Sequence, residues 1–368
     1  MRYTDFDRYG GIVEAGAALR KYYGLETEWE GDPDLLEWLD RGSFRCVVVL
    51  LIDAMGTSIL DRYGDPDGFF RKNMKKQIMT VFPPTTTAAV TSLLTGKYPK
   101  QNAWLGWNQY FHETDDNIIL FRNTGQYSDI DYSGFTDTHL PVKPVYDELN
   151  ENGIPAETVW PAWSAHNACA DFHELCEKTL AAAGDPDIRF IYAYWDALDS
   201  FMHKNGPEDP GTGEMIRMLE KETAVLAEHL PADCGLLVTA DHSQISVTHY
   251  SLDSNRELCG CFRHKPAIEG RACAFYIRED RREKFEQLFQ EELGDQFELY
   301  THEDVNRLNI FGKGKAHPRF EEFTGDYLAV AAGSVQLDYM KKKDMKGNHA
   351  GGLPEEAQIP LILFPQEV

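Results

Sequence analysis

Three uninterrupted apolar runs, each followed closely by an aspartate, constrain the fold of this chain more than any other feature. The runs and their aspartates are residues 46–52 with Asp53, residues 190–195 with Asp199, and residues 235–240 with Asp241. A strand that is apolar at every position, rather than at alternate positions, is typical of a parallel sheet covered on both faces. The three runs therefore predict buried strands of one mainly parallel sheet.

Segments with helical patterning separate these strands. They are residues 11–23, 34–39, 141–152, 172–183 and 215–229, and two further strand candidates are residues 78–82 and 328–331. Strands that alternate with helices indicate an α/β fold, in which helices flank a mainly parallel central sheet. We expect this core to comprise residues 1–249 and 326–368.

One region departs from the alternation of strands and helices. A polar, turn-rich stretch is followed by a strand-like segment, a charged helix and a second strand-like segment, which are residues 251–263, 272–277, 281–293 and 297–300. This order predicts a small α+β insertion of residues 250–325, called the cap segment below. Because it leaves the core directly after Asp241 and His242, we expect the cap segment to shape a ligand pocket.

The charge of the chain limits its partners. The sequence has 60 acidic residues against 36 lysines and arginines, a formal charge of −24. Such a surface disfavours nucleic acid polymers and anionic membranes. An anionic ligand would need local positive charge, which bound metal ions can supply.

The cysteines and the apolar runs bear on localisation. The seven cysteines are an odd number without the spacing of a zinc or redox motif, which predicts free thiols in a reducing compartment. Residues 1–8 contain no apolar stretch of signal-peptide length, and no apolar run approaches the roughly 20 residues that span a bilayer. We expect a soluble, cytoplasmic protein and leave its oligomeric state open.

Histidines stand at fixed offsets from two of the three aspartates. Asp199 and His203 are four residues apart and share one face of a helix or turn, and His242 directly follows Asp241. A single aspartate after a strand is more often a helix cap, but three carboxylates at one sheet edge repel one another unless a cation holds them. Nitrogen and carboxylate ligands without thiolate suit zinc or manganese. The pattern therefore predicts a metal site.

A run of threonines supplies candidates for a nucleophile. Two prolines end the strand candidate 78–82, and Thr85, Thr86 and Thr87 then begin an apolar helix that Gly96 closes. A hydroxyl at this position can simply cap the helix. The same helix N-terminus attracts anions, and a hydroxyl beside a metal there can lose its proton and attack phosphorus.

Five dispersed motifs, taken together, resemble the nucleotide pyrophosphatase/phosphodiesterase branch of the alkaline phosphatase superfamily. They are Asp53, the threonine segment ending in Thr95-Gly96, residues 199–207, Asp241-His242, and residues 347–349. The resemblance spans residues 44–364. It implies an alkaline phosphatase-like catalytic core.

The resemblance also implies which residues bind two divalent metal ions, zinc or else manganese. One ion would be held by Asp199, His203 and His349, although His349 alone would be interpreted as an exposed loop histidine. The other would be held by Asp53, Asp241, His242 and the nucleophile. The nucleophile of this family stands ten residues before the glycine of its Thr-Gly pair, which gives Thr86, with Thr87 as the alternative.

The implied function is hydrolysis of a small-molecule phosphate ester, either a phosphodiester or a nucleotide pyrophosphate. Thr86, deprotonated on its metal, would attack phosphorus in line. The second metal would stabilise the leaving oxygen and then activate water to release the phosphothreonine, with the two ions about 4 Å apart.

Three positions depart from the family pattern. Ala89 replaces an asparagine that helps to hold a phosphoryl oxygen, and Asn108 is the candidate to replace it as a substrate-binding residue. Met202 and Ala350 replace glycines beside the metal-binding histidines. The Ala89 change keeps a phosphomonoesterase or a phosphonate hydrolase as alternatives. A catalytically silent binding protein is disfavoured because all six metal-ligand positions are filled.

Six aromatic residues have two interpretations. Trp104, Trp107, Tyr110, Trp160, Trp163 and Trp195 either line a substrate pocket or pack in the core between sheet and helices.

Overall fold

The computed structural model describes residues 11–164, 166–340 and 344–366. Residues 1–8, which we expect not to form a signal peptide, lie outside this part of the chain. None of the described helices is both long and apolar enough to cross a membrane.

The central sheet has seven strands in the order β2-β18-β9-β1-β8-β6-β7. Their bounds are β1 Cys46–Ile52, β2 Met74–Met79, β6 Ala156–Pro161, β7 Ala168–Cys169, β8 Phe190–Trp195, β9 Cys234–Thr239 and β18 Gln358–Phe364. β1 lies between β8 and β9 and pairs with both in parallel. Only β18 runs against its neighbours β2 and β9. The predicted mainly parallel sheet is confirmed.

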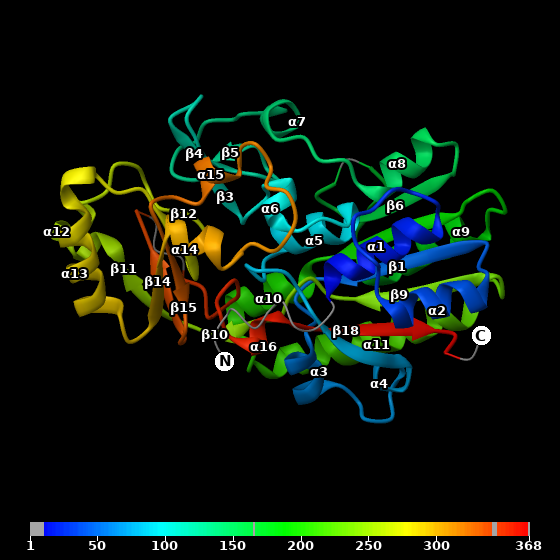
Figure 1. Ribbon diagram of the computed structural model, residues 1–368. Coiled ribbons are helices and arrows are strands. Elements are labelled where there is room, and N and C mark those ends of the chain that lie inside the picture. The colour runs from blue at the N-terminus through cyan, green and yellow to red at the C-terminus, as the bar shows by residue number, and fades with distance from the viewer. Residues whose placement is uncertain (1–10, 165, 341–343, 367–368) are drawn as a thin grey trace.

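Two layers of helices enclose this sheet (Figure 1). One layer contains α1 Ile12–Tyr22, α2 Pro33–Gly42, α5 Thr86–Thr95, α6 Pro99–Asn102 and α8 Val145–Glu151. The other contains α3 Thr57–Tyr63, α4 Phe69–Asn73, α9 Phe172–Gly184, α10 Ala197–Asn205 and α11 Pro210–His229. All residues of β1, β8 and β9 are buried, which explains their uninterrupted apolar sequences.

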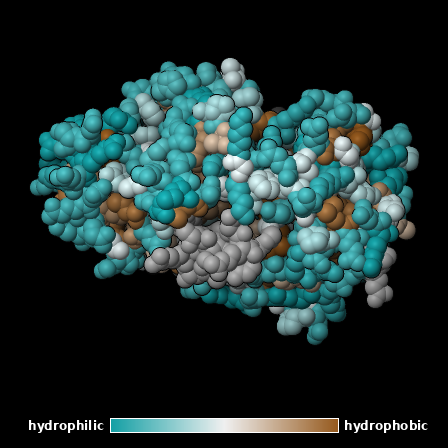
Figure 2. All heavy atoms as spheres, viewed as in Figure 1, coloured by the Kyte–Doolittle hydropathy of each residue, from teal (hydrophilic) through white to brown (hydrophobic). Residues whose placement is uncertain are grey.

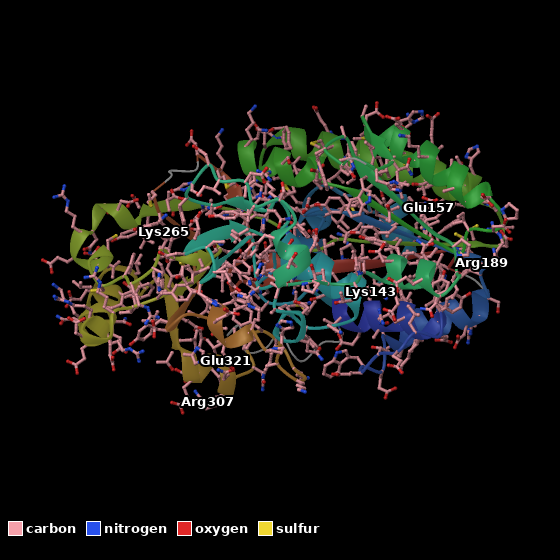
Figure 3. All side chains as sticks on the ribbon, turned by 90° about the horizontal axis from the view of Figure 1, so that it is seen from above. Lys143, Glu157, Arg189, Lys265, Arg307 and Glu321 are labelled. Carbon is pink, nitrogen blue, oxygen red and sulfur yellow. The ribbon has the colours of Figure 1, made fainter. Side chains whose placement is uncertain are left out.

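A second sheet lies beside the first, in the order β14-β15-β13-β12-β3-β4-β5 (Figures 1 and 3). Its strands are β3 Asn108–Phe111, β4 Asp116–Ile119, β5 Thr124–Gly125, β12 Ala267–Ile268, β13 Ala272–Phe275, β14 Phe297–Thr301 and β15 Tyr327–Ala331. Every pairing in it is antiparallel. In Figure 3, Lys265, Arg307 and Glu321 mark this part of the molecule, and Lys143, Glu157 and Arg189 mark the part around the central sheet.

The second sheet extends beyond the cap segment. The strand candidate 328–331, expected in the core, forms β15 between β13 and β14 instead. A strand buried on both faces has the same apolar sequence in either sheet, so the sequence does not identify its partners. β3, β4 and β5 also come from outside residues 250–325. Deleting the cap segment would remove both neighbours of β15, β13 and β14, and one neighbour of β3, β12.

The strand candidate 78–82 lies earlier than predicted, at Met74–Met79. Only the last two residues of this edge strand are buried, so its first four residues lack the apolar signal of the inner strands.

The remaining elements are short or lie on the second sheet. They are α7 Phe135–His139, α12 Arg256–Cys259, α13 Arg282–Leu293, α14 His302–Arg307, α15 Phe320–Phe323, α16 Pro354–Ala357, and the strand pairs β10 Ile245–Ser246 with β17 Gly347–Asn348 and β11 Thr248–Ser251 with β16 Val335–Asp338. α13 packs through Phe285, Phe289 and Leu293 against the second sheet. Figure 2 shows that the face seen in Figure 1 is mostly hydrophilic, as the composition predicts.

The contact between α1 and α5 allows a test of the packing. A Cβ added to Gly16 would lie 2.3 Å from the backbone carbonyl oxygen of Leu93, so the two helices would have to separate. We expect Gly16→Ala to lower the free energy of unfolding by about 1–3 kcal/mol, measured by urea denaturation. Gly184→Ala, where an added Cβ meets nothing within 4 Å, is the control and should leave stability unchanged or slightly raised.

Candidate active site

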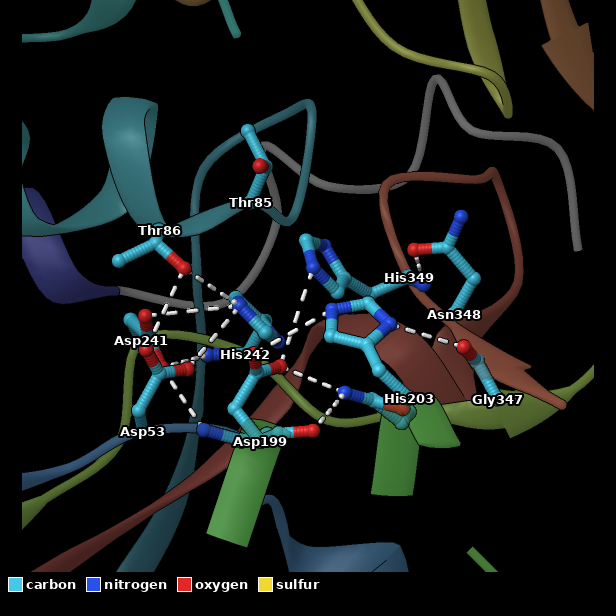
Figure 4. A network of polar contacts seen from close by, with 12 residues as sticks. Asp53, Thr85, Thr86, Asp199, His203, Asp241, His242, Gly347, Asn348 and His349 are labelled. Atoms are coloured by element: carbon cyan, nitrogen blue, oxygen red, sulfur yellow. Dashed lines mark hydrogen bonds and ion pairs between the residues drawn. The ribbon is translucent and has the colours of Figure 1, made fainter. Parts of the chain in front are cut away.

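The parallel strands bring the predicted site residues to one edge of the central sheet (Figure 4). Asp53 directly follows β1, and Asp241 and His242 follow β9 after a single residue, Ala240. Asp199 and His203 lie on α10, which begins two residues after β8. In an open α/β sheet, the carboxyl ends of parallel strands form the ligand-binding edge.

Two further segments complete the site. Thr86 is the first residue of α5. His349 follows β17, which pairs with β10 just beyond the Asp241-His242 pair. Figure 4 shows Thr86, His242 and His349 converging on Asp53 and Asp199.

Asp199, His203 and His349 form one group of potential ligands. Asp199 Oδ2 lies 3.3 Å from His203 Nε2, and Asp199 Oδ1 lies 3.9 Å from His349 Nε2. One ligand atom from each residue lies within 4.8 Å of the others. The three atoms could therefore bind one ion.

Asp53, Asp241, His242 and Thr86 form the other group. Nε2 of His242 lies 3.4 Å from Asp53 Oδ1 and 3.5 Å from Asp241 Oδ2. Thr86 Oγ1 lies 3.0 Å from His242 Nε2 and 3.4 Å from Asp53 Oδ2. Asp53 and His242 also form a compact cluster with Asp199, so the Asp199 carboxylate faces both groups.

The three histidines are oriented as metal ligands. In each, Nδ1 lies beside a backbone carbonyl oxygen: His203 at 2.9 Å from Gly347, His242 at 3.2 Å from Ser243, and His349 at 3.0 Å from Pro84. A proton on Nδ1 that is donated to a carbonyl leaves Nε2 with a lone pair. All three Nε2 atoms face aspartates of the cluster.

Each of two buried carboxylates, those of Asp53 and Asp241, has one oxygen without a hydrogen-bond donor among the described residues. Within the described part of the chain, neither Asp53 Oδ1 nor Asp241 Oδ2 has a hydrogen-bond partner, and both residues are at most 2% exposed. Burial, together with the charges of Asp241 and Asp199, raises the pKa of Asp53 well above its usual value. Bound cations would remove this repulsion, so the residues fit a metal centre.

The electrostatics of the other ligands agree with this interpretation. Burial, followed by the neighbouring His242, lowers the pKa of His349 well below its usual value, which keeps the imidazole neutral. Burial would raise the pKa of Asp199, but the adjacent imidazoles, first that of His203, hold it below its usual value. A neutral histidine and an ionised aspartate are the forms that bind metal.

The threonine run places only one hydroxyl in this cluster. Thr85 Oγ1 donates to Glu269 Oε1 at 2.6 Å, away from the aspartates. Thr87 is fully buried. Thr85 occupies the N-cap position of α5, yet its side chain makes no capping hydrogen bond, so capping does not account for the threonines.

A cavity of about 1490 Å³ opens at the site between the two sheets. Thr86, Asp199, His203 and His349 line it, as do residues of the cap segment such as Glu269 and Cys273. Of the six aromatic residues, Trp107, Trp160 and Trp163 line this cavity. Trp104 and Trp195 are buried core residues, and Tyr110 lines a different cavity.

Asn108 lies in the cavity wall but is engaged elsewhere. Its amide donates to the Ile268 carbonyl at 3.2 Å, and its oxygen accepts from Asn117 at 3.0 Å. A substrate contact from Asn108 stays a prediction. Ala89 is fully buried within α5.

The other two departures from the family pattern have structural counterparts. Ala350 has a φ of 80°, in the left-handed region that favours glycine. Met202 is fully buried in the core on α10. The backbone at position 350 thus keeps a conformation that favours glycine, whereas at position 202 the larger side chain packs into the core.

Three residues that sequence reasoning missed contact the site. The Tyr194 hydroxyl donates to Asp53 Oδ2, and Gln244 Nε2 donates to Asp199 Oδ1 at 2.5 Å. Glu269 accepts from the Trp107 backbone as well as from Thr85. Tyr194 stands one residue before the end of β8. Its place near the carboxyl end of a buried strand could have indicated that it lies close to the site. Glu269 had no such signal, because it lies in the turn between β12 and β13 of the second sheet, far from the threonines in sequence.

Comparison with known proteins agrees with this geometry. The family profile described as type I phosphodiesterase/nucleotide pyrophosphatase matches residues 47–352. A bis(5'-adenosyl)-triphosphatase of Bos taurus is 23% identical over 240 residues, 58% of this chain and 50% of the relative. Ectonucleotide pyrophosphatase/phosphodiesterase family member 7 of Homo sapiens is 23% identical over 206 residues, 49% of this chain and 43% of the relative. The chain thus spans about half the length of these curated relatives.

Solved structures share the fold. An inactive variant of murine ectonucleotide pyrophosphatase/phosphodiesterase 5 in complex with AMP superposes with a TM-score of 0.65 at 19% identity, over 86% of this chain and 87% of that one. Phosphonoacetate hydrolase from Sinorhizobium meliloti 1021, in complex with phosphonoformate, gives 0.64 at 14% identity, over 88% and 91%. Since the family profile covers most of the sequence, this chain belongs to the type I phosphodiesterase/nucleotide pyrophosphatase family.

Proposed function

We propose that this protein hydrolyses phosphate esters of small molecules, with phosphodiesters and nucleotide pyrophosphates as the first candidates, through a covalent intermediate on Thr86. The observation that carries the proposal is the position of the Thr86 hydroxyl. Its Oγ1 lies at the N-terminus of α5, 3.0 Å from His242 Nε2 and 3.4 Å from Asp53 Oδ2. Thr86 also lines the cavity. The family to which the chain belongs supports the reaction class.

Two divalent ions, zinc or manganese, would be held by the two groups of ligands. Asp199, His203 and His349 would hold one, and Asp53, Asp241, His242 and Thr86 the other. When bound, the ions supply the positive charge that an acidic chain lacks, and they stabilise the attacking and leaving oxygens of an in-line displacement.

The chain itself positions the reacting atoms. α5 presents Thr86 Oγ1 from a helix N-terminus, where the orphan backbone N–H groups favour an anionic phosphate. Oγ1 loses its proton and bonds to phosphorus as the bond from phosphorus to the leaving oxygen breaks, and the leaving oxygen takes up a proton. Water then attacks phosphorus, the bond to Oγ1 breaks, a proton from the water returns to Oγ1, and the phosphate product leaves with the remaining hydroxyl.

Phosphonate hydrolysis is the second candidate. Ala89 provides no amide to hold a phosphoryl oxygen, and the fold also matches that of phosphonoacetate hydrolase. A phosphomonoesterase is the remaining alternative.

A panel of substrates tests the proposed reaction. We expect turnover of bis-p-nitrophenyl phosphate to exceed that of p-nitrophenyl phosphate and of phosphonoacetate. Elemental analysis of the active enzyme should find two ions per protomer, and removing them with a chelator should abolish turnover until zinc or manganese is restored. Activity on phosphonoacetate alone would favour the second candidate, and one ion or none in active enzyme would contradict the two-metal proposal.

A further inference from the structure

A fully buried ion pair lies next to the candidate metal centre but contributes no ligand to it. Arg271 and Glu356 are both 0% exposed. Their contact is bidentate, with Nε donating to Oε1 at 2.8 Å and Nη2 donating to Oε2 at 2.9 Å. Removing two charges from water is unfavourable, and proteins in which apolar residues replace such a pair are often equally stable. Stability alone therefore does not explain the pair.

Glu356 contacts the two chain segments that carry His242 and His349. Its Oε1 accepts the N–H of Gly351 at 2.8 Å, and its Oε2 accepts that of Leu353 at 3.3 Å. Its backbone carbonyl accepts the N–H of Ser243 at 2.8 Å. Gly351 stands two residues after His349, and Ser243 directly follows His242. One residue thus holds both segments that carry these histidines.

Arg271 connects this point to the second sheet. It precedes β13, and its guanidinium also donates to the carbonyl oxygens of Val335 and Gly333, each at 2.9 Å. A Cβ on Gly351 would lie 2.6 Å from both Arg271 Nη2 and Glu356 Oε2. A side chain at position 351 would therefore displace the ion pair.

We propose that Arg271 and Glu356 are positioning residues that hold His242 and His349 in the relative orientation the two metal sites need. The two imidazole rings are stacked, with centroids 3.7 Å apart and planes 19° from parallel. Each ring belongs to a segment that Glu356 holds through a backbone N–H. The second sheet thereby acts on the geometry of the metal centre as well as on the cavity wall. This inference rests on the proposed metal centre.

The test uses the whole chain loaded with Co²⁺. The visible absorption of bound Co²⁺ reports the geometry of its ligands. In the double variant Arg271→Met/Glu356→Leu, an apolar pair replaces the ion pair, so the protein should fold while Gly351 and Leu353 lose their acceptor. We expect its Co²⁺ affinity to fall about 10- to 100-fold, as for other groups that orient metal ligands. We also expect an altered Co²⁺ spectrum, and a lower kcat at saturating metal with little change in KM. Arg271→Lys, which keeps the charge but not the fork, should show the same changes to a smaller extent.

Arg20→Met is the matched control. Arg20 is 7% exposed and pairs with Glu148 at 2.8 Å between α1 and α8. Its loss should lower stability but leave the Co²⁺ spectrum, the Co²⁺ affinity and kcat unchanged. If the double variant keeps the wild-type spectrum and affinity, the positioning role is overturned while the proposed metal centre stands. If the double variant does not fold, the test rests on Arg271→Lys. A wild-type Co²⁺ spectrum and a wild-type Co²⁺ affinity in Arg271→Lys would then also overturn the positioning role. If the wild-type protein binds no Co²⁺, the metal centre and this inference fail together.

Discussion

Thr86→Ala is expected to retain its fold and its metal content and to lose activity by about 10⁴- to 10⁶-fold, the range seen when a hydrolase loses one member of its catalytic triad. The Thr86 hydroxyl contacts Asp53 and His242, and the change removes one hydroxyl and one methyl group from a half-buried position. The free energy of unfolding should therefore change by less than about 1 kcal/mol. The measurements are kcat on a phosphodiester, thermal denaturation and elemental analysis.

The neighbouring threonines provide the controls for Thr86. Thr85→Ala loses a hydrogen bond to Glu269, and Thr87→Ala loses a buried hydroxyl, but neither change removes an oxygen from the Asp53–His242 cluster. Both variants should turn over, and Thr86→Ser should keep part of the activity because its hydroxyl survives. Rapid acid quenching followed by mass spectrometry should find phosphate on Thr86 alone. An inactive Thr87→Ala beside an active Thr86→Ala would mean that the register is wrong by one residue, and three active variants would exclude the covalent threonine mechanism.

Asp241→Asn should abolish turnover for a different reason, because it removes negative charge from the proposed metal centre. Oδ1 of Asp241 accepts the N–H groups of Ala54 at 3.0 Å and His242 at 2.9 Å, which an asparagine oxygen can also do. Its Oδ2, buried and without a partner in the described structure, would become an amide N–H₂ that cannot bind a cation. We expect metal affinity to fall by at least about 10- to 100-fold, and activity to fall with it.

Stability distinguishes this effect from general damage to the fold. In the wild type without metal, Asp53 and Asp241 repel each other, and the neighbouring carboxylate contributes to the raised pKa of Asp53. Metal-free Asp241→Asn should therefore denature at a temperature equal to or above that of the metal-free wild type. Added zinc should raise the denaturation temperature of the wild type much more than that of the variant. A ligand stabilises the folded state in proportion to how tightly it binds that state, and the variant should bind zinc more weakly. Asp233→Asn, which loses an exposed ion pair with Arg45, is the control and should respond to zinc as the wild type does. A variant that is less stable than wild type without metal but equally stabilised by zinc would contradict the proposed role of Asp241.

The local sequence determined the central strands and the residues at their ends. β1, β8 and β9 lie where uninterrupted apolar runs predicted them, because a strand buried on both faces has to be apolar at every position. Parallel pairing then brings the ends of such strands to one edge, so Asp53, Asp199 and Asp241 come together there. The local sequence also predicted the helix that begins at Thr86 and ends before Gly96. The signals were the two prolines before it, the threonines at its start and Gly96 at its end, whose φ is 63°.

Only the tertiary structure decided which segments pair at long range. β15 has the apolar sequence of a core strand yet lies in the second sheet, and β18 closes the central sheet against the direction of its neighbours. Sequence patterns report how deeply a segment is buried but not what buries it, because the hydrophobic effect has no direction. Polar partners distant in sequence were hidden for the same reason: the contact of Tyr194 with Asp53 joins residues 141 positions apart. The Arg271–Glu356 pair, 85 positions apart, exists only because the second sheet packs against the segments that carry His242 and His349, and no local pattern in the sequence encodes that contact.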